Sequence, residues 1–360
     1  MTVEKTVGGR VILPHRIIED GAVSIDGGKI VFVGERRDAP FARDAEYYPG
    51  CAVMPGFVDI HCHAGGVDAK DGPAEMAEYH LAHGTTSLLC TFYRGFSTEE
   101  YLEMIGRVGE DMKKCPNLRG VHMEGPYLNP RYGAESSGCV GAVPKRADYL
   151  PIAETGFVRQ WTFAPEVEGT DRFLADITEF GIVPAIGHTA ASPAQVKAAV
   201  AGGARIFTHI FDATGCAVEP SAFDGTVEMS ASLAGLLCDE LSFELICDSG
   251  GIHVRPEYVE LLRKFAGPDR IIGITDHCLG GEEGSDVNVV NGELYGSRLT
   301  MDLVAKNLFA LGFSLPEISR ITALNPARAV GLKNVGALEV GYAGDLVILR
   351  DDMTVRNVMI

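Results

Sequence analysis

Residues 53–63 read Val-Met-Pro-Gly-Phe-Val-Asp-Ile-His-Cys-His, and this stretch decides how the rest of the chain is interpreted. Its apolar residues follow a Pro-Gly turn and predict a buried strand. Alternate side chains of a strand share a face, so we expect His61 and His63 to project together while Cys62 points away. Two imidazoles side by side at a strand end provide half of a metal site. The alternative is that they are only polar residues where a strand enters a loop, and the rest of the sequence has to decide.

Apolar runs typical of buried strands recur along the chain, and helix-like stretches separate them. One such stretch has Ser192 as a helix N-cap and Pro193 at the first helical position. Eight strand–helix units predict an α/β fold of the TIM-barrel type. A doubly wound sheet is the competing topology, but no glycine-rich dinucleotide motif follows the first run. The eight runs are Val53–His63, Thr86–Cys90, Leu118–Glu124, Gln160–Ala164, Ile182–His188, Arg205–His209, Phe243–Asp248 and Ile271–Asp276.

The two ends of the chain show a different pattern, of short alternating segments and glycine turns. Residues 22–25 and 30–33 flank the turn Asp-Gly-Gly-Lys, which predicts a hairpin. Residues 336–341 and 343–349 predict matching strands near the other end. We therefore expect residues 1–52 plus 336–360 to form one small β-domain, and residues 53–335 to form the barrel domain.

Composition limits the classes of partner. The chain has 31 basic and 49 acidic residues, a net charge of -18, and no basic cluster, so nucleic acid is not an expected partner. No apolar run approaches the ~20 residues that span a bilayer, and the N-terminus lacks a signal-peptide core. We expect a cytoplasmic protein with no membrane partner. Its nine scattered cysteines form no C-x-x-C, which argues against a disulfide framework or a structural zinc knuckle.

Five of the eight runs end on residues that can bind a metal ion. In a TIM barrel the C-terminal ends of the strands surround one site, and buried charged groups need a partner. A divalent ion is that partner, and imidazole and carboxylate ligands suit Zn, Fe, Mn or Co. The candidate ligands are His61, His63, Glu124, His188, His209 and Asp276.

Six ligands are more than one catalytic zinc ion uses. The simplest interpretation is two adjacent ions. Glu124, His188 and His209 would hold one ion, and His61 and His63 the other, with Glu124 or the attacking water between them. One ion, assisted by the last carboxylate of the set, is the alternative.

These motifs resemble the amidohydrolase superfamily. The resemblance is carried by the His-Cys-His after its strand, Gly187–Thr189, Thr208-His209, Thr275-Asp276 and Gly344–Val347. Within that superfamily, four segments resemble the N-acetylglucosamine-6-phosphate deacetylases, in order and over nearly the whole chain. They are His122–Asn129, Gly187–Ala191, His209–Ala213 and Gly296–Met301, and the His-x-Glu-Gly-Pro block in the first is the most specific.

The resemblance implies a distorted TIM barrel with a β-sandwich built from both termini, a homodimer, and removal of the N-acetyl group from an amino sugar. It implies Glu124, His188 and His209 as the main metal ligands and His61 and His63 as a second site, with zinc as the first expectation. Asp276 corresponds to the catalytic aspartate, which would serve as general base and then general acid toward a metal-activated water. The implied substrate contacts are His253, Asp212, Ala213 and Glu135.

The chain departs from the family's pattern at those contacts. Asp212 stands where the family usually has Asn, Glu135 stands in place of His or Gln, and residues 216–228 contain no basic residue to reach a phosphate. We therefore expect a weaker phosphate preference, because like charges repel. The residues that could compensate are Arg94, Arg131, Lys145 and Arg298.

Two alternatives remain open. One is an amidohydrolase acting on another N-acyl compound or a cyclic amide without phosphate. The other is a non-enzymatic scaffold, which the retention of every ligand disfavours. Among the remaining residues, His122 is either a support for Glu124 or a packing residue, His80 and His83 are expected at the surface, and Cys62 and Cys278 are expected to pack behind the site.

Overall fold

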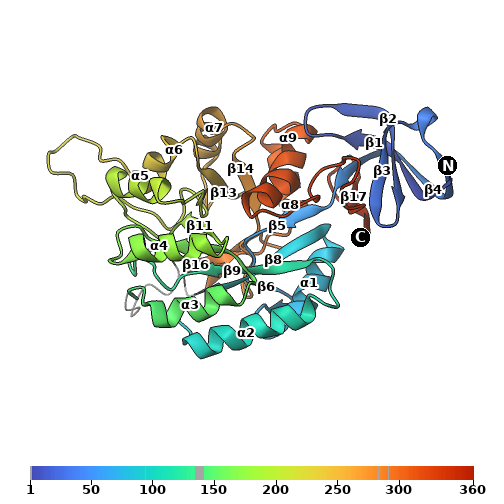
Figure 1. Ribbon diagram of the computed structural model, residues 1–360. Coiled ribbons are helices and arrows are strands. Elements are labelled where there is room, and N and C mark those ends of the chain that lie inside the picture. The colour runs from blue at the N-terminus through green and yellow to red at the C-terminus, as the bar shows by residue number, and fades with distance from the viewer. Residues whose placement is uncertain (1, 94, 134–141, 282–283, 291) are drawn as a thin grey trace.

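The computed structural model describes residues 2–93, 95–133, 142–281, 284–290 and 292–360 (Figure 1). Its largest sheet has eight strands in the order β14-β13-β12-β11-β10-β9-β8-β5, and each neighbouring pair is parallel. Neighbours in the sheet are neighbours in the chain, which confirms the barrel and excludes the doubly wound order. The strands are β5 Phe57–Asp59, β8 Thr85–Tyr93, β9 Leu118–Glu124, β10 Val158–Phe163, β11 Val183–Ile186, β12 Ile206–Phe207, β13 Ser242–Ile246 and β14 Ile271–Ile274.

Helices follow the strands and pack their apolar faces against the barrel. In α2 the buried residues Tyr101, Met104, Ile105 and Val108 recur at helical spacing, and a capping box begins the helix. The helix predicted after Ser192 is α5, again with a capping box. The helices are α1 Pro73–Ala82, α2 Thr98–Asp111, α3 Arg146–Glu154, α4 Thr170–Glu179, α5 Pro193–Ala201, α6 Ala231–Leu236, α7 Pro256–Phe265, α8 Met301–Ala310, α9 Leu315–Ser319 and α10 Asn325–Ala329.

The edge strands β5 and β14 are joined by a buried side chain. The Thr275 hydroxyl donates to Asp59 Oδ2 at 2.6 Å, and the Asp276 amide donates to the His61 carbonyl at 2.9 Å. Burial raises the pKa of Asp59 to about 7, against the opposing effect of the hydrogen bonds that Asp59 accepts from Thr275 and from the His61 amide. The first and last strands of the barrel therefore meet through Asp59, and the residues that follow them are held side by side.

Strands from both ends of the chain form one six-stranded sheet in the order β18-β17-β4-β1-β2-β3 (Figure 1). Side chains from β1, β2, β4 and β17, among them Val7, Val23, Val53 and Ile348, meet in its own apolar core. The predicted small β-domain from both termini is confirmed, and so is the hairpin, as β2–β3. The strands are β1 Thr2–Ile12, β2 Ile17–Asp26, β3 Lys29–Glu35, β4 Phe41–Pro55, β17 Leu346–Leu349 and β18 Val355–Met359.

The strand predicted over residues 336–341 is wrong. Gly336 and Gly341 have φ of 82° and 93°, so the backbone turns at both ends of this segment. Within residues 336–341, the Gly341 amide bonds to the hairpin, where it donates to the Ile30 carbonyl at 2.8 Å. Leu338 is nevertheless buried in the core of the six-stranded sheet.

Residues 52–57 carry the chain from that sheet into the barrel. Val53 faces the core of the six-stranded sheet, whereas Ala52 and Met54 face the barrel core, as the two-residue period of a strand requires. A Cβ at Gly56 would lie 2.1 Å from Thr86 Oγ1, so only glycine fits between β4 and β5. Because β4 runs on to Pro55, the division at residues 52 and 53 stays a prediction.

Two short hairpins lie beside the C-terminal ends of the barrel strands. They are β6 Ala64–Gly65 with β7 Val67–Asp68, and β15 Val287–Val290 with β16 Glu293–Ser297. Both contribute residues to the cavity described below. Within the part of the chain that the structure describes, no helix is long and apolar enough to cross a membrane.

Candidate metal centre and cavity

All six predicted ligands come together at the C-terminal ends of the barrel strands. Glu124 is the last residue of β9, and the other ligands lie within a few residues of the ends of β5, β11, β12 and β14. His188, His209 and Asp276 have φ of 46°, 24° and 49°, in a region that residues with a side chain seldom adopt. Such backbone costs of order 1–3 kcal/mol per residue and concentrates at functional sites.

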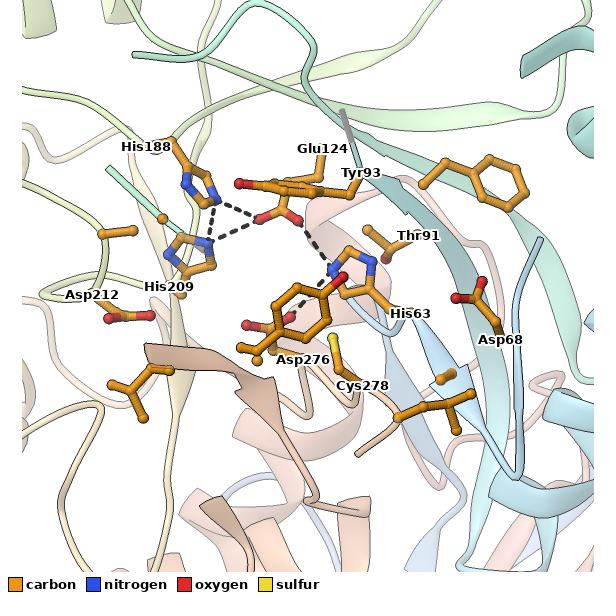
Figure 2. A pocket seen from close by; sticks show the side chains of 18 of the residues that line it. His63, Asp68, Thr91, Tyr93, Glu124, His188, His209, Asp212, Asp276 and Cys278 are labelled. Atoms are coloured by element: carbon orange, nitrogen blue, oxygen red, sulfur yellow. Dashed lines mark hydrogen bonds and ion pairs between the residues drawn. The ribbon is translucent and has the colours of Figure 1, made fainter. Parts of the chain in front are cut away.

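Three of these side chains form a compact triangle (Figure 2). His188 Nε2 and His209 Nε2 lie 2.8 and 3.0 Å from Glu124 Oε1, and the two nitrogens lie 3.1 Å apart. Ligand atoms that share one ion at about 2.0–2.2 Å stand roughly 3 Å from each other. The spacing of this triangle therefore fits a divalent ion.

The other two imidazoles approach the carboxylates of Glu124 and Asp276. His63 Nε2 lies 3.0 Å from Glu124 Oε2 and 3.3 Å from Asp276 Oδ1. His61 Nε2 lies 3.4 Å from Glu124 Oε1 and 3.4 Å from Asp276 Oδ1. Glu124 thus stands between two groups of ligand atoms, and the predicted common face of His61 and His63 is confirmed.

Two ring nitrogens in this centre are buried without a hydrogen-bond partner in the described structure, His61 Nε2 and His209 Nδ1. An unsatisfied buried polar atom is costly, and one explanation is an ion that is bound there. His61 Nε2 is directed at the carboxylates of the site. The chemistry of the donors and this unpartnered nitrogen both fit a cation.

The pKa values of the residues in the centre also fit a bound cation. Burial favours neutral rings, but Asp276 and Glu124 outweigh it and raise the pKa of His63 to about 9. The pKa of His209 is likewise about 9, because Glu124 outweighs burial. Against its own burial, the pKa of Glu124 falls well below its usual value because of His61 and His188. A bound cation would therefore displace protons from the imidazoles.

Glu244, in β13, supports the centre from behind and was missed in the sequence. Its side chain is fully buried, and His61 Nδ1 lies 3.0 Å from its Oε2. The Gln160 amide donates to its Oε1 at 2.6 Å. A proton held on Nδ1 by this carboxylate leaves the Nε2 lone pair of His61 directed into the site. The signal was available, because a carboxylate inside the apolar run Phe243–Ile246 has to have a buried partner.

The structure corrects two predictions about residues around the metal centre, those for His80 and Cys278. His80 is fully buried, not exposed, because α1 turns it inward, where its Nε2 lies 2.7 Å from the Ala64 carbonyl. Cys278 was expected behind the site but lines the cavity. Cys62 does pack behind it, fully buried, with Sγ 3.1 Å from His80 Nε2. His122 is fully buried, and its ring stands 4.5 Å edge-on from that of His61.

A cavity of about 630 Å³ opens over the ligands. Beyond the metal centre its wall contains aromatic and aliphatic side chains together with a few charged ones. No sequence pattern indicated the aromatic and aliphatic residues, which come from the end of β8 and the loop after it, from the loop after β14, and from β16. They are Phe92, Tyr93, Phe96, Leu279, Leu294 and Tyr295.

The structure places some of the predicted substrate contacts on the cavity wall and others elsewhere. Asp212 and Ala213 line the cavity, with φ of 48° at Ala213, while Glu135 lies outside the described residues. His253 is absent from the described cavity wall. Its Nδ1 lies 3.0 Å from Asp248 Oδ2, and its Nε2 lies 3.1 Å from the Gly296 carbonyl. It would reach a ligand only by giving up the bond to Gly296.

The residues proposed to replace the missing phosphate ligand are not in the described wall of the cavity. Arg131, Lys145 and Arg298 do not line it, and Arg94 lies outside the described residues. The Arg298 guanidinium instead donates to the carbonyls of residues 280 and 281, at 2.5 and 3.2 Å. With these contacts Arg298 does not face the cavity. Whether the cavity suits a phosphate therefore depends on its other charged residues.

Comparison with known proteins bears out the resemblance. The Amidohydrolase family matches residues 255–360. An N-acetylglucosamine-6-phosphate deacetylase of Bos taurus is 28% identical over 390 residues, covering 95% of this chain and 91% of that protein. An N-acetylgalactosamine-6-phosphate deacetylase of Escherichia coli O157:H7 is 26% identical over 378 residues, covering 98% of this chain and 96% of the relative.

Solved structures give the same result for the fold. A mutant N-acetyl-D-glucosamine-6-phosphate deacetylase from Mycobacterium smegmatis, in complex with N-acetyl-D-glucosamine-6-phosphate, superposes with a TM-score of 0.86. The two chains are 27% identical, and the match covers 99% of this chain and 98% of the other. The fold of this chain is therefore shared with that protein over nearly the full length of both chains.

Proposed function

We propose that this chain, which resembles the amidohydrolases in sequence, fold and ligand set, is a metal-dependent hydrolase that removes the N-acetyl group from an amino sugar. One observation carries the proposal. Four imidazoles and two carboxylates from different barrel strands converge within hydrogen-bonding distance below a cavity. The relatives named as deacetylases of N-acetylated amino sugar phosphates support the choice of substrate class.

We assign the metal ligands as the sequence suggested. Glu124, His188 and His209 would hold one ion, and His61 and His63 a second. Glu124 lies close enough to both groups to contribute to either ion, because its Oε1 is near His188, His209 and His61 and its Oε2 is near His63. We propose zinc, with iron, manganese or cobalt as the alternatives that the donors allow. When bound, the metal would supply an activated water and polarise the carbonyl of the amide.

Asp276 is the proposed general base and acid. The imidazoles of His61 and His63 outweigh burial and lower its pKa, so the carboxylate is ionised and ready to accept a proton at neutral pH. It would take the proton of the attacking water and pass it to the amino group that leaves. Acetate and the free amino sugar are the products, and water is the only co-reactant.

The remaining residues position the reaction. Glu244 holds the proton on His61 Nδ1 and so keeps Nε2 free for a cation. Asp212 and Ala213 would contact the sugar from the cavity wall. We retain Glu135 and His253 as substrate contacts only as predictions, together with the homodimer and the division into residues 1–52 plus 336–360 and 53–335.

The test is acetate release from N-acetylated amino sugars, measured together with the metal content. Protein purified without chelator should contain between one and two equivalents of a transition metal and should release acetate. Less than about a tenth of an equivalent, with no activity restored by Zn, Mn, Co or Fe, would refute the metal-dependent hydrolase. Activity confined to other N-acyl compounds or cyclic amides would refute the deacetylation of amino sugars while leaving the metal chemistry intact.

A further inference from the structure

We propose that the part of the cavity away from the metal centre binds an uncharged, partly apolar portion of the substrate, so that the preferred substrate is an N-acetylated amino sugar without a phosphate group. This inference rests on the proposed deacetylation and names its substrate class. It follows from the walls of the cavity, in which apolar surface and negative charge occur where a phosphate would need cations.

The apolar part of the wall is built from several elements. Phe96 packs edge-on against Tyr101, with ring centroids 5.6 Å apart, and is thereby held in place. Leu279 is 45% exposed although it lies on the wall of a cavity, and Leu294 comes from the neighbouring hairpin. Ligand cavities use such surface to bind apolar groups, while a phosphate gains nothing from it.

The charged part of the wall is acidic. Among the described residues that line the cavity outside the ligand set, Asp68, Asp212 and Glu293 are acidic, and Lys70 is the one lysine or arginine. Three negative charges and one positive charge give a balance of -2. Lys70 is already paired, because its Nζ lies 2.8 Å from Asp68 Oδ2 and 3.3 Å from Asp71 Oδ2.

Figure 2 shows Asp212 and Asp68 on opposite sides of the metal centre. The Asp212 amide donates to the His209 carbonyl at 3.0 Å, so this acidic residue lies on the cavity wall directly beside the metal centre. A dianionic phosphate in this cavity would therefore meet carboxylates from two sides. Phosphate sites ordinarily provide charge-assisted donors from Arg or Lys instead.

The experiment compares kcat/KM for three substrates that differ at one position: N-acetylglucosamine, its 6-O-methyl ether and its 6-phosphate. We measure kcat/KM instead of binding because a phosphate could also bind the metal ions unproductively. The two uncharged substrates should be preferred to the 6-phosphate by at least about tenfold, the loss that one unfavourable charged contact produces. Equal or better turnover of the 6-phosphate would overturn this inference and leave the deacetylase proposal standing, whereas no acetate from any of the three would overturn both.

Two further measurements isolate the charge. Asp212→Asn should narrow the discrimination against the 6-phosphate severalfold, while Asp239→Asn, which removes the same charge from a fully exposed side chain, should not change it. In the unmodified protein, the discrimination should also narrow as the ionic strength rises from about 0.02 to 0.5 M, because salt screens repulsion. If the preference for the uncharged substrates over the 6-phosphate did not change with ionic strength, repulsion by these carboxylates would not be its cause.

Discussion

Replacement of Glu244 by glutamine tests how the barrel prepares His61 for a cation. The carboxylate accepts from His61 Nδ1 at 3.0 Å and from Gln160 Nε2 at 2.6 Å, so both of its oxygens are in use. The substituted amide has the same shape but only one oxygen. Gln160 can accommodate the change by turning its amide, because its own Oε1 is buried and has no partner in the described structure.

The expected loss of metal affinity follows from the interactions of His61 that remain after Gln160 has turned its amide. His61 keeps an acceptor but loses the negative charge that fixes its proton and makes Nε2 a better donor to a metal. Changes to such supporting groups reduce metal affinity about 10- to 100-fold, or roughly 1.4–2.7 kcal/mol. Glu244→Ala should be worse for stability, since it removes the acceptor of three buried donors, His61 Nδ1, Gln160 Nε2 and the His209 amide, at about 1–3 kcal/mol for each donor left unpaired.

The assay is competition with a chromophoric chelator at fixed pH, followed by elemental analysis of the separated protein. We expect Glu244→Gln to weaken binding of the ion assigned to His61 and His63 by about 10- to 100-fold and to leave thermal unfolding of the metal-free protein nearly unchanged. Glu240→Gln, at an exposed position after α6, is the matched control. Unchanged affinity and stoichiometry in Glu244→Gln would show that His61 does not depend on this carboxylate, and the assigned positioning role would be wrong.

Asp276→Asn should keep its metal and its fold but lose kcat by about 10²-fold or more, and near-normal turnover would remove it as the general base. Glu124→Gln should lose both activity and most of its metal by elemental analysis. In chelator-treated protein, the pKa of His63 and of His209 is about 9 in the folded state and near 6.5 in the unfolded state. Their contribution to the free energy of unfolding is therefore complete below pH 6.5 and is lost as the pH rises through 9. Denaturant unfolding at pH 7 and 10 measures this. Gly56→Ala should lower the free energy of unfolding by about 1–3 kcal/mol or more through the clash with Thr86, whereas Ala at the exposed helical Gly106 should not.

Most of the fold was predictable because barrel strands are buried on both faces and so appear in sequence as continuous apolar runs. The ligands could be found for a related reason, since polar residues that end such runs meet at one end of the barrel. His188 and Asp276 stand out in this way. The bridge made by Asp59 could not be anticipated, because an aspartate beside two histidines gives no sign of pairing with Thr275 across the barrel.

The predictions that were wrong or missing also have physical explanations. Helical spacing placed His80 on a helix but could not say which side of α1 faces the barrel. Alternation placed a strand over residues 336–341, where left-handed glycines turn the backbone instead. The shape and charge of the cavity depend on Asp68, Leu279 and Glu293, which come from separate loops and hairpins, and no local pattern brings such residues together.

The pairing of the two chain ends also sets an order of events during synthesis. Val53 in β4 pairs with Ile348 in β17, 348 minus 53 or 295 residues later. At about 5–20 residues per second, a ribosome takes roughly 15–60 s to deliver that partner. Throughout this interval the apolar edge of β4 from Ala52 to Pro55 has no strand to pair with, and open edges of this kind invite aggregation. We therefore expect the nascent chain to need protection until its final residues emerge, and the last strands to act as the closing step of folding.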